Sequence, residues 1–192
     1  SQLALRQRVA FMRALEGDIW PDLSDEALMN DLQWLEPFLS GISRRSQLVR
    51  LPLDAALALL LPRPLRNRLN QEAPESLSVP SGSSIRLDYS GTVHESTVKG
   101  PILAVKLQEV FGMTQTPRVA NGRISVLLHL LSPAGRPLQI TQDIEGFWRN
   151  GYPSVRAEMR GRYPKHPWPD NPLTALPTRH TKKQLERQSD RK

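Results

Sequence analysis

Residues 124–140 read ISVLLHLLSPAGRPLQI, and this stretch decides the fold of the second half of the chain. Apolar residues alternate along it at a period of two, at Ile124, Val126, Leu128 and Leu130 and then at Leu138 and Ile140. Such alternation is typical of a half-buried strand, and residues 132–135, Ser-Pro-Ala-Gly, have the composition of a turn. The stretch therefore predicts a β-hairpin.

The sequence upstream repeats this pattern, with alternating residues at 77–79 and 85–89 on either side of Pro80-Ser81-Gly82-Ser83. It predicts a second hairpin. Between the two hairpins, apolar residues recur at helical spacing between a proline and a glycine, which predicts a helix over residues 102–111.

Two short helices are predicted after the second of these hairpins. Asp143 can cap the first helix, and Pro153 can occupy the first turn of the second, which Gly161 ends. The elements of residues 76–163 then follow the order ββαββαα, so we expect an α+β domain with a small antiparallel sheet.

Residues 1–75 have helical rather than strand periodicity, so we expect a bundle of short helices there. Gly17 ends the first helix, Ser24 can cap the second, and Pro52 and Pro64 can begin later ones. This bundle is the N-terminal part of the α+β fold.

Residues 164–192 are predicted to form a proline-rich extended arm followed by a basic tail. Five prolines lie between residues 164 and 177, and they exclude helix and central strand alike. From Arg179 to Lys192 the sequence is polar and basic, so we expect poor order there. The predicted domains are therefore residues 1–75, 76–163 and 164–192.

The composition limits the class of protein. The chain has 192 residues, of which 39% are hydrophobic and 23% charged, as in globular proteins, and it has no cysteine. A disulfide scaffold, a thiolate zinc site and a cysteine nucleophile are thereby excluded. The longest apolar run, residues 55–62, falls short of the roughly 20 residues that span a bilayer, so we expect no membrane association and a cytoplasmic protein. The chain begins without methionine inside an apolar pattern, so we expect a fragment of a longer protein.

The net charge of +7 is unevenly distributed. Residues 1–42 carry three basic and seven acidic residues, residues 43–68 carry six arginines and one aspartate, and residues 160–192 carry nine basic and three acidic residues. Basic zones neutralise phosphates, so nucleic acid is a natural partner. The alternative is that these side chains are only solvated and keep the protein soluble.

The sequence contains no motif of a catalytic or metal site. A phosphate-binding loop GxxxxGK[ST], a GxGxxG fingerprint, an HExxH zinc motif and a GxSxG nucleophile elbow are all absent, and the four histidines are scattered. We therefore expect no catalytic residue, no metal and no cofactor in this chain.

Residues 160–169, RGRYPKHPWP, are the most distinctive stretch, because basic and aromatic residues alternate there on a proline-stiffened backbone. Arginine and lysine can bind phosphates while an aromatic ring stacks on a base, as in single-strand binding proteins. The alternative is an arm packed on its own domain, with Trp168 filling a groove. The candidate nucleic-acid-binding residues are Arg160, Arg162, Tyr163, Lys165 and Trp168, together with Arg44 and Arg45 of the first basic zone.

Several of these stretches resemble the C-terminal region of the HrpB family, bacterial ATP-dependent RNA helicases of the DEAH/DExH type. They are residues 79–83, 104–109, 127–137, 146–149 and, above all, 161–170, which read GRYPKHPWPD. The last string is long and unusual in composition, which makes the resemblance specific. It extends over roughly residues 1–180.

The resemblance implies an accessory region beyond the motor of a helicase. ATP and magnesium are implied only for the motor domains, whose Walker and DExH motifs are absent here, so no catalytic residue carries over to this chain. The implied partners are RNA or single-stranded DNA and the motor domains of the same polypeptide. Guidance of the strand is one expected role. A structural or protein-interaction cap without nucleic-acid contact is the alternative, and an independent enzyme is the least supported.

Overall fold

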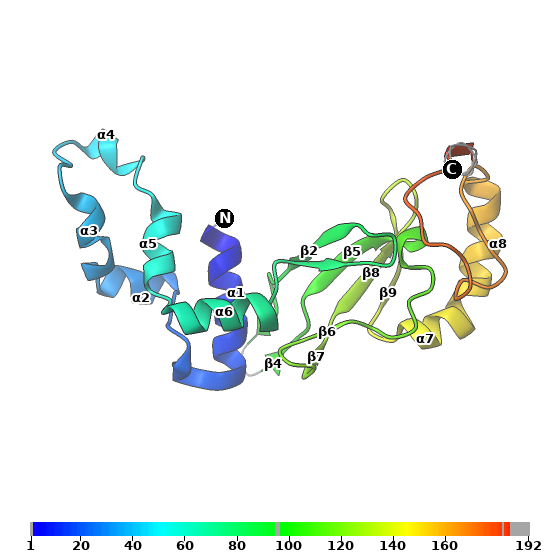
Figure 1. Cartoon of the computed structure of the whole chain (residues 1–192), viewed down its shortest axis with the longest axis horizontal. Coiled ribbons are helices and arrows are strands. Elements are labelled where there is room, and N and C mark those ends of the chain that lie inside the picture. Colours follow the sequence, from blue (N-terminus) through cyan, green and yellow to red (C-terminus); the bar gives the residue numbers. More distant parts are fainter. Residues whose placement is uncertain (1, 95–96, 182, 185–192) are drawn as a thin grey trace. The chain divides into compact units, whose positions relative to one another are not determined.

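The computed structural model describes residues 2–94, 97–181 and 183–184 (Figure 1). Most of the basic tail expected at residues 179–192 lies outside the described residues. The chain divides into two compact units: unit 1 comprises Ser1–Glu75 and Tyr89–Lys99, and unit 2 comprises Ser76–Asp88 and Gly100–Lys192. The three domains expected from the sequence, residues 1–75, 76–163 and 164–192, stay a prediction.

Unit 1 is a set of short helices, as its periodicity predicts. Gly17 adopts a φ of +73°, which ends the first helix, and the hydroxyl of Ser24 accepts a hydrogen bond from the backbone nitrogen of Ala27, which caps the second. The helices are α1 (Gln2–Glu16), α2 (Asp25–Asn30), α3 (Glu36–Leu39), α4 (Arg45–Leu48), α5 (Leu53–Leu59) and α6 (Arg63–Glu72), with 3₁₀ turns at Gly17–Ile19 and Gln33–Leu35.

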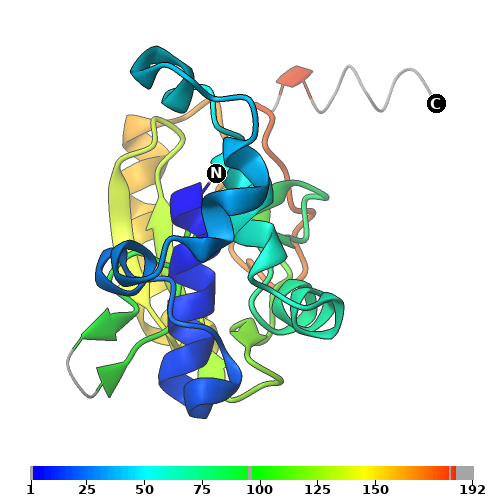
Figure 2. The same ribbon diagram turned by 90° about the vertical axis from the view of Figure 1, so that its left-hand side faces the viewer.

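The core of unit 1 forms around α1, which contacts α5, α6 and the small hairpin of β3 (Val93–His94) and β4 (Thr97–Val98) (Figure 2). Phe11 and Met12 of α1 are fully buried, and the Phe11 ring meets that of Tyr89 edge to face at 5.3 Å between centroids. The burial of these apolar side chains stabilises helices that are too short to be stable alone.

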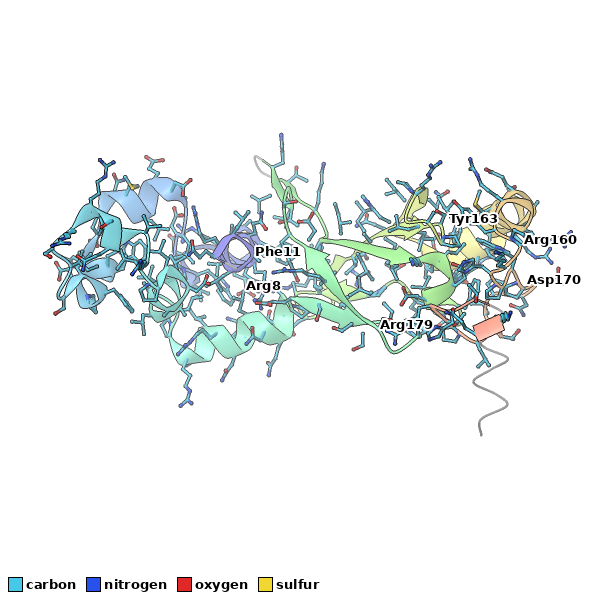
Figure 3. All side chains as sticks on the ribbon, turned by 90° about the horizontal axis from the view of Figure 1, so that it is seen from above. Arg8, Phe11, Arg160, Tyr163, Asp170 and Arg179 are labelled. Carbon is cyan, nitrogen blue, oxygen red and sulfur yellow. The ribbon has the colours of Figure 1, made fainter. Side chains whose placement is uncertain are left out.

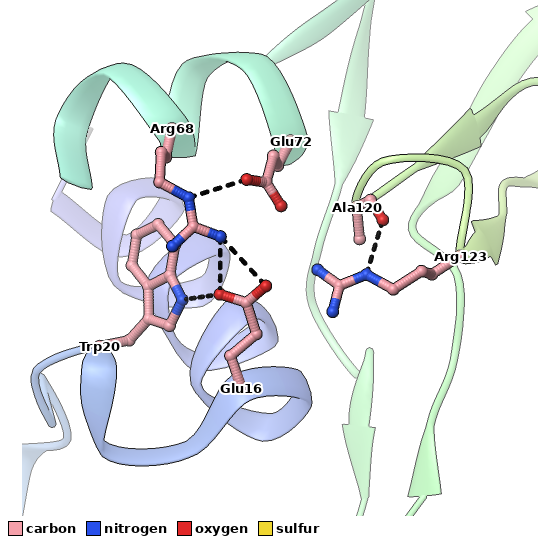
Figure 4. A network of polar contacts seen from close by, with 6 residues as sticks. All are labelled: Glu16, Trp20, Arg68, Glu72, Ala120 and Arg123. Carbon is pink, nitrogen blue, oxygen red and sulfur yellow. Dashed lines mark hydrogen bonds and ion pairs between the residues drawn. The ribbon is translucent and has the colours of Figure 1, made fainter. Parts of the chain in front are cut away.

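Two arginines of unit 1 bind carbonyl and carboxylate groups within the same unit. Arg8 on α1 is 2% exposed, and its guanidinium donates to the carbonyl oxygens of Leu69 and Ala73 at the end of α6, at 3.2 and 2.6 Å (labelled in Figure 3). The carbonyl of Leu69 also accepts from the backbone nitrogen of Ala73 at 2.9 Å, and Arg8 adds side-chain hydrogen bonds at this last turn of α6, where carbonyls run out of helical donors. Arg68 forms the second anchor: Figure 4 shows its guanidinium bound to the carboxylates of Glu16 and Glu72, each at 2.9 Å.

Unit 2 is built on a five-stranded sheet. The strands are ordered β1-β2-β5-β8-β9, with β5 and β8 parallel and the other neighbours antiparallel. Both predicted hairpins are confirmed, the first as β1 and β2, the second as β8 and β9. The bounds are β1 (Ser76–Ser78), β2 (Ser84–Asp88), β5 (Ile102–Lys106), β8 (Leu127–Leu131) and β9 (Pro137–Thr141); a separate small hairpin pairs β6 (Arg118–Val119) with β7 (Ile124–Ser125).

The helix predicted over residues 102–111 is wrong. Strand β5 occupies Ile102–Lys106, and only Leu107–Val110 form a 3₁₀ turn. Leu103 and Val105 are buried on one face, while Ala104 is exposed on the other, so the segment has the period of a strand. Its helical spacing arose because a strand runs directly into a 3₁₀ turn. The order ββαββαα is corrected accordingly, and the sheet is mixed rather than antiparallel. The α+β class itself is confirmed.

The sheet is followed by α7 (Ile144–Gly146), a π-helical turn at Phe147–Gly151 and α8 (Tyr152–Arg162). Asp143 caps α7 as predicted, because its carboxylate accepts from the backbone nitrogen of Gly146 at 2.9 Å. Aromatic rings from this region pack in one cluster with centroids 5.1 to 6.4 Å apart; they are Phe111, Phe147, Trp148 and Tyr152. This cluster fixes the start of α8 in unit 2.

No helix in the described part of the chain is both long and apolar enough to span a membrane.

Candidate nucleic-acid interface

The end of α8 and the β8–β9 turn together line a pocket of about 210 Å³. We call it the Tyr163 pocket. Its apolar wall is formed by Leu138, Val155 and Met159, and its polar side chains include Arg136, Arg162 and Tyr163.

The turn positions Arg136 by local hydrogen bonds. Ser132 donates its backbone nitrogen to the carbonyl of Arg136 at 2.7 Å, and its hydroxyl accepts from the backbone nitrogen of Arg136 at 3.1 Å. Gly135, with a φ of +78°, supplies the left-handed conformation that closes the turn. The side chain of Arg136 is therefore carried by a fixed hairpin end and not by a free loop.

Helix α8 positions the other polar residues. Pro153 lies in its first turn, and Met159 is buried in the domain, which fixes the face that α8 turns inward. The backbone nitrogen of Tyr163 donates to the carbonyl of Met159 at 2.7 Å, so the half-buried Tyr163 directly follows the last helical turn. Figure 3 labels Arg160 and Tyr163 at this end of α8.

Positive charge exceeds negative charge both in the pocket lining and in the segment at the end of α8. Arg136, Arg160 and Lys165 are exposed, and within the described residues none of them forms an ion pair. Arg162 has a single contact, to Glu158 at 3.6 Å, and an exposed pair of this kind contributes little. Because Glu158 is the one carboxylate among the residues that line the pocket, the cationic side chains outnumber it.

Trp168 is placed differently from the other candidates. Its indole is 5% exposed, and Nε1 donates to the carbonyl of Tyr163 at 2.9 Å. The carbonyl of Trp168 accepts from Nε of Arg156 at 2.9 Å, and Arg156 pairs with Asp170 at 2.5 Å. Both sets of contacts hold the segment after α8 against its own unit, so Trp168 presents no open face on which a base could stack. This arrangement corresponds to the packed-arm alternative.

The neighbouring His166 adds no charge at neutral pH. Partial burial, assisted by the positive charge of Lys106, lowers the pKa of His166 below its usual value of 6.5. The positive surface therefore depends on arginine and lysine alone.

Arg44 and Arg45 belong to unit 1 and do not line the pocket. They lie at the start of α4, where both are exposed. The structure therefore brings Arg162 and Tyr163 together and leaves Arg44 and Arg45 outside this group.

Arg136 is the residue that sequence reasoning missed. It stands 24 positions before Arg160, outside both basic zones. The sequence feature that could have pointed to Arg136 is its position directly after a predicted turn, because a residue at that position lies at the end of the sheet. Only the packing of α8 beside that turn makes the proximity visible.

The described residues include no group of three or more histidines, aspartates and glutamates that could hold a metal ion. The groups that the pocket offers to a ligand are two guanidinium groups, the hydroxyl groups of Ser132 and Tyr163, the carboxylate of Glu158 and an aromatic ring.

Comparison with known proteins gives a consistent set of matches. The family model described as ATP-dependent helicase C-terminal matches residues 34–172. The chain is 45% identical over 183 residues to the ATP-dependent RNA helicase HrpB of Escherichia coli strain K12, an alignment that covers 95% of this chain and 22% of that protein. The chain thus spans about a fifth of the length of the curated relative it matches.

Two solved structures show the same similarity. A crystal structure of the E. coli DExH-box NTPase HrpB matches with a TM-score of 0.82 and 42% identity, covering 94% of this chain and 22% of that one. A crystal structure of the E. coli DEAH/RHA helicase HrpB matches with a TM-score of 0.65 and 42% identity, covering 87% and 20%.

Proposed function

Because this chain belongs to the C-terminal family of HrpB-type ATP-dependent helicases, we propose that it guides a single nucleic-acid strand for the motor domains of such a helicase. The name of the E. coli relative specifies RNA, and RNA is accordingly the strand that we propose. ATP and magnesium would belong to the motor domains. This chain contains no Walker or DExH motif, so we expect it to neither bind nor hydrolyse ATP on its own.

The observation that supports this proposal is the composition of the Tyr163 pocket. Arg136, Arg162 and the aromatic Tyr163 line it together with an apolar wall. A volume of about 210 Å³ corresponds to roughly seven water molecules, which is room for a single base. A base that stacks on Tyr163 would leave its phosphates beside the two guanidinium groups, the combination used for single strands.

Two further exposed cations, which do not line the pocket, would extend this interaction along a nucleic-acid strand. Arg160 and Lys165 lie on either side of Tyr163 in the sequence, and both are exposed. Phosphate contacts are independent of the base, so they suit a guide that must let every sequence pass.

The proposal is tested by comparing two double variants that remove the same charge. Arg162→Ala with Lys165→Ala should weaken binding of a labelled single strand similarly for every base sequence. It should also flatten the slope of log K against log salt by about 0.7 for each phosphate that the variant no longer binds. Arg44→Ala with Arg45→Ala is the control and should leave the slope nearly unchanged. Equal effects of the two double variants would show that net charge, and not this site, drives binding.

A cap that contacts the motor domains is a second candidate function, favoured by exposed apolar side chains in unit 1. Met29 is 73% exposed and Val49 is 89% exposed, and Leu32, Leu48 and Leu59 are exposed as well. Large apolar side chains that are exposed on a unit are available for contact with a protein partner. Replacing Met29 and Val49 by serine would then weaken binding of the chain to the separately expressed motor domains, with strand affinity unchanged.

A further inference from the structure

A second pocket, of about 250 Å³, lies in unit 2 and is lined by residues 81–83 of the β1–β2 turn and by residues 177–180. We call it the Ser83 pocket. Its lining is rich in hydroxyl groups and includes the cationic side chain of Arg179. The Tyr163 pocket shares no residue with it.

Strand pairing places both pockets at one end of the sheet. Lys106 at the end of β5 pairs with Leu131 at the end of β8, because these strands are parallel. Strand β2 runs antiparallel to β5, so its first residue, Ser84, lies at this same end. The β1–β2 turn and the β8–β9 turn therefore share this end.

The distance between the β1–β2 turn and the β8–β9 turn matches a short stretch of a nucleic-acid strand. β5 separates β2 from β8, and strands lie about 4.8 Å apart, so β2 and β8 are roughly 10 Å apart. Successive phosphates of one strand advance about 3.4 Å along the axis of a duplex, and they lie farther apart in an extended single strand. A segment of a few nucleotides thus reaches from one turn to the other.

Hydrogen bonding gives the Ser83 pocket a defined polarity. Glu109, 7% exposed, accepts a hydrogen bond from the hydroxyl of Ser81 at 2.9 Å. A serine hydroxyl has a single hydrogen, and that of Ser81 is donated to Glu109. In the 3.1 Å contact between the hydroxyls of Ser81 and Ser83, the Ser81 oxygen is therefore the acceptor and Ser83 is the donor. The lone pairs of the Ser83 hydroxyl then remain to accept a hydrogen bond from a ligand.

The opposite wall is held by backbone contacts. Thr178 donates its backbone nitrogen to the carbonyl of Gln108 at 2.8 Å, and the Thr178 hydroxyl accepts from the backbone nitrogen of His180 at 2.9 Å. Thr178 is buried, whereas Arg179 between these two anchors is exposed. Within the described residues Arg179 makes no ion pair, so its guanidinium can bind an anion.

We propose that the Ser83 pocket binds one ribose-phosphate unit of an RNA strand. The guanidinium of Arg179 binds the phosphate oxygens, and the hydroxyl of Ser83 accepts a hydrogen bond from the ribose 2′-hydroxyl. DNA lacks this donor, so the pocket distinguishes RNA from DNA. The inference rests on the proposed strand-guiding function and adds to it a second contact point and a basis for RNA preference.

The test uses the full 192-residue chain, with oligouridine and its 2′-deoxy counterpart of equal length as probes in fluorescence anisotropy. The unaltered chain should bind the ribo strand about three- to tenfold more tightly, the effect of one net hydrogen bond. Ser83→Ala should bring the two affinities together by weakening only the ribo strand. Arg179→Gln should weaken both strands and reduce the salt slope by about 0.7.

Ser84→Ala provides the matched control, because Ser84 is adjacent but its hydroxyl contacts that of Ser76 in β1 and does not line the pocket. It should leave the ratio of affinities unchanged. An unaltered chain that binds both strands equally, or a Ser83→Ala variant that folds normally and keeps the preference, would overturn the ribose-phosphate site while leaving strand guidance intact. No binding of either strand by the unaltered chain would overturn both proposals.

Discussion

The basic zone at residues 43–68 and the first part of the second basic zone, residues 160–168, have different structural surroundings. In the first, Arg68 is bound to two glutamates, while Arg44 and Arg45 lie exposed at the start of a short helix and do not line the Tyr163 pocket. In the second, Arg162 lines a pocket with Tyr163. Basic composition in the sequence therefore does not by itself determine whether a side chain lines a pocket.

The difference lies in what holds each zone in place. The second zone begins in the last turn of α8, a helix anchored by buried aromatic rings, and Trp168 holds the segment after α8 in place. The first zone is carried by α4 to α6, whose lengths are 4, 7 and 10 residues. Helices this short depend on packing, and α4 buries no residue. A fixed scaffold makes a cationic side chain part of a site, because binding then does not have to order it.

The largest expected effect is a loss of stability on replacing Trp168, which holds the segment after α8 in place. Trp168→Ala removes a buried indole and its hydrogen bond to Tyr163, so it should reduce the free energy of unfolding by about 3–5 kcal/mol. Chemical denaturation followed by circular dichroism measures this. Arg44→Ala, in the first zone, is the control and should change stability by less than about 0.5 kcal/mol. Equal stabilities of the two variants would remove the structural distinction between the zones.

A similar loss of stability is expected when a core residue of unit 2, the unit that contains the second zone, is truncated. Leu107 is fully buried in the 3₁₀ turn after β5, so Leu107→Ala should reduce the free energy of unfolding by about 2–5 kcal/mol. Strand binding should persist in the fraction that remains folded, because Leu107 does not line the Tyr163 pocket. An unchanged unfolding midpoint would contradict its place in the core.

Tyr163→Ala sharpens the comparison at the level of binding. Loss of the stacking ring should weaken single-strand binding by about 1–3 kcal/mol with little change in the salt slope, because the ring carries no charge. Tyr163→Phe keeps the ring and should retain most of the affinity. If the phenylalanine variant loses as much as the alanine variant, the hydroxyl and not the ring makes the contact.

The smallest effect is a pH dependence in the second zone. The pKa of His166 is lowered in the folded state by burial and by Lys106, so between that pKa and 6.5 the unfolded chain binds more protons. The stability that His166 contributes is therefore present above pH 6.5 and lost as the pH falls below it. His166→Asn should weaken the pH dependence of the unfolding free energy between about pH 7.5 and 5.5. Parallel curves for both proteins would show that His166 does not contribute.

Local patterns were sufficient for those elements whose signals lie within a few residues. The caps at Ser24 and Asp143 and the turn at residues 132–135 were predictable, because each is set by side-chain and backbone contacts of neighbouring residues. Residues 102–111 were not, because a strand that runs into a 3₁₀ turn reproduces helical spacing. The partners that make β5 a central strand come from 14 or more residues away.

The candidate site divides in the same way. The sequence by itself determined that residues 160–168 are basic and aromatic and that the chain resembles the HrpB C-terminal region, because composition and motif are local properties. Only the tertiary structure decided that Trp168 is internal and that Arg136 lies beside Tyr163. Burial and proximity depend on which surfaces pack together, and here that packing is the contact of α8 with a hairpin turn more than 20 residues earlier in the chain.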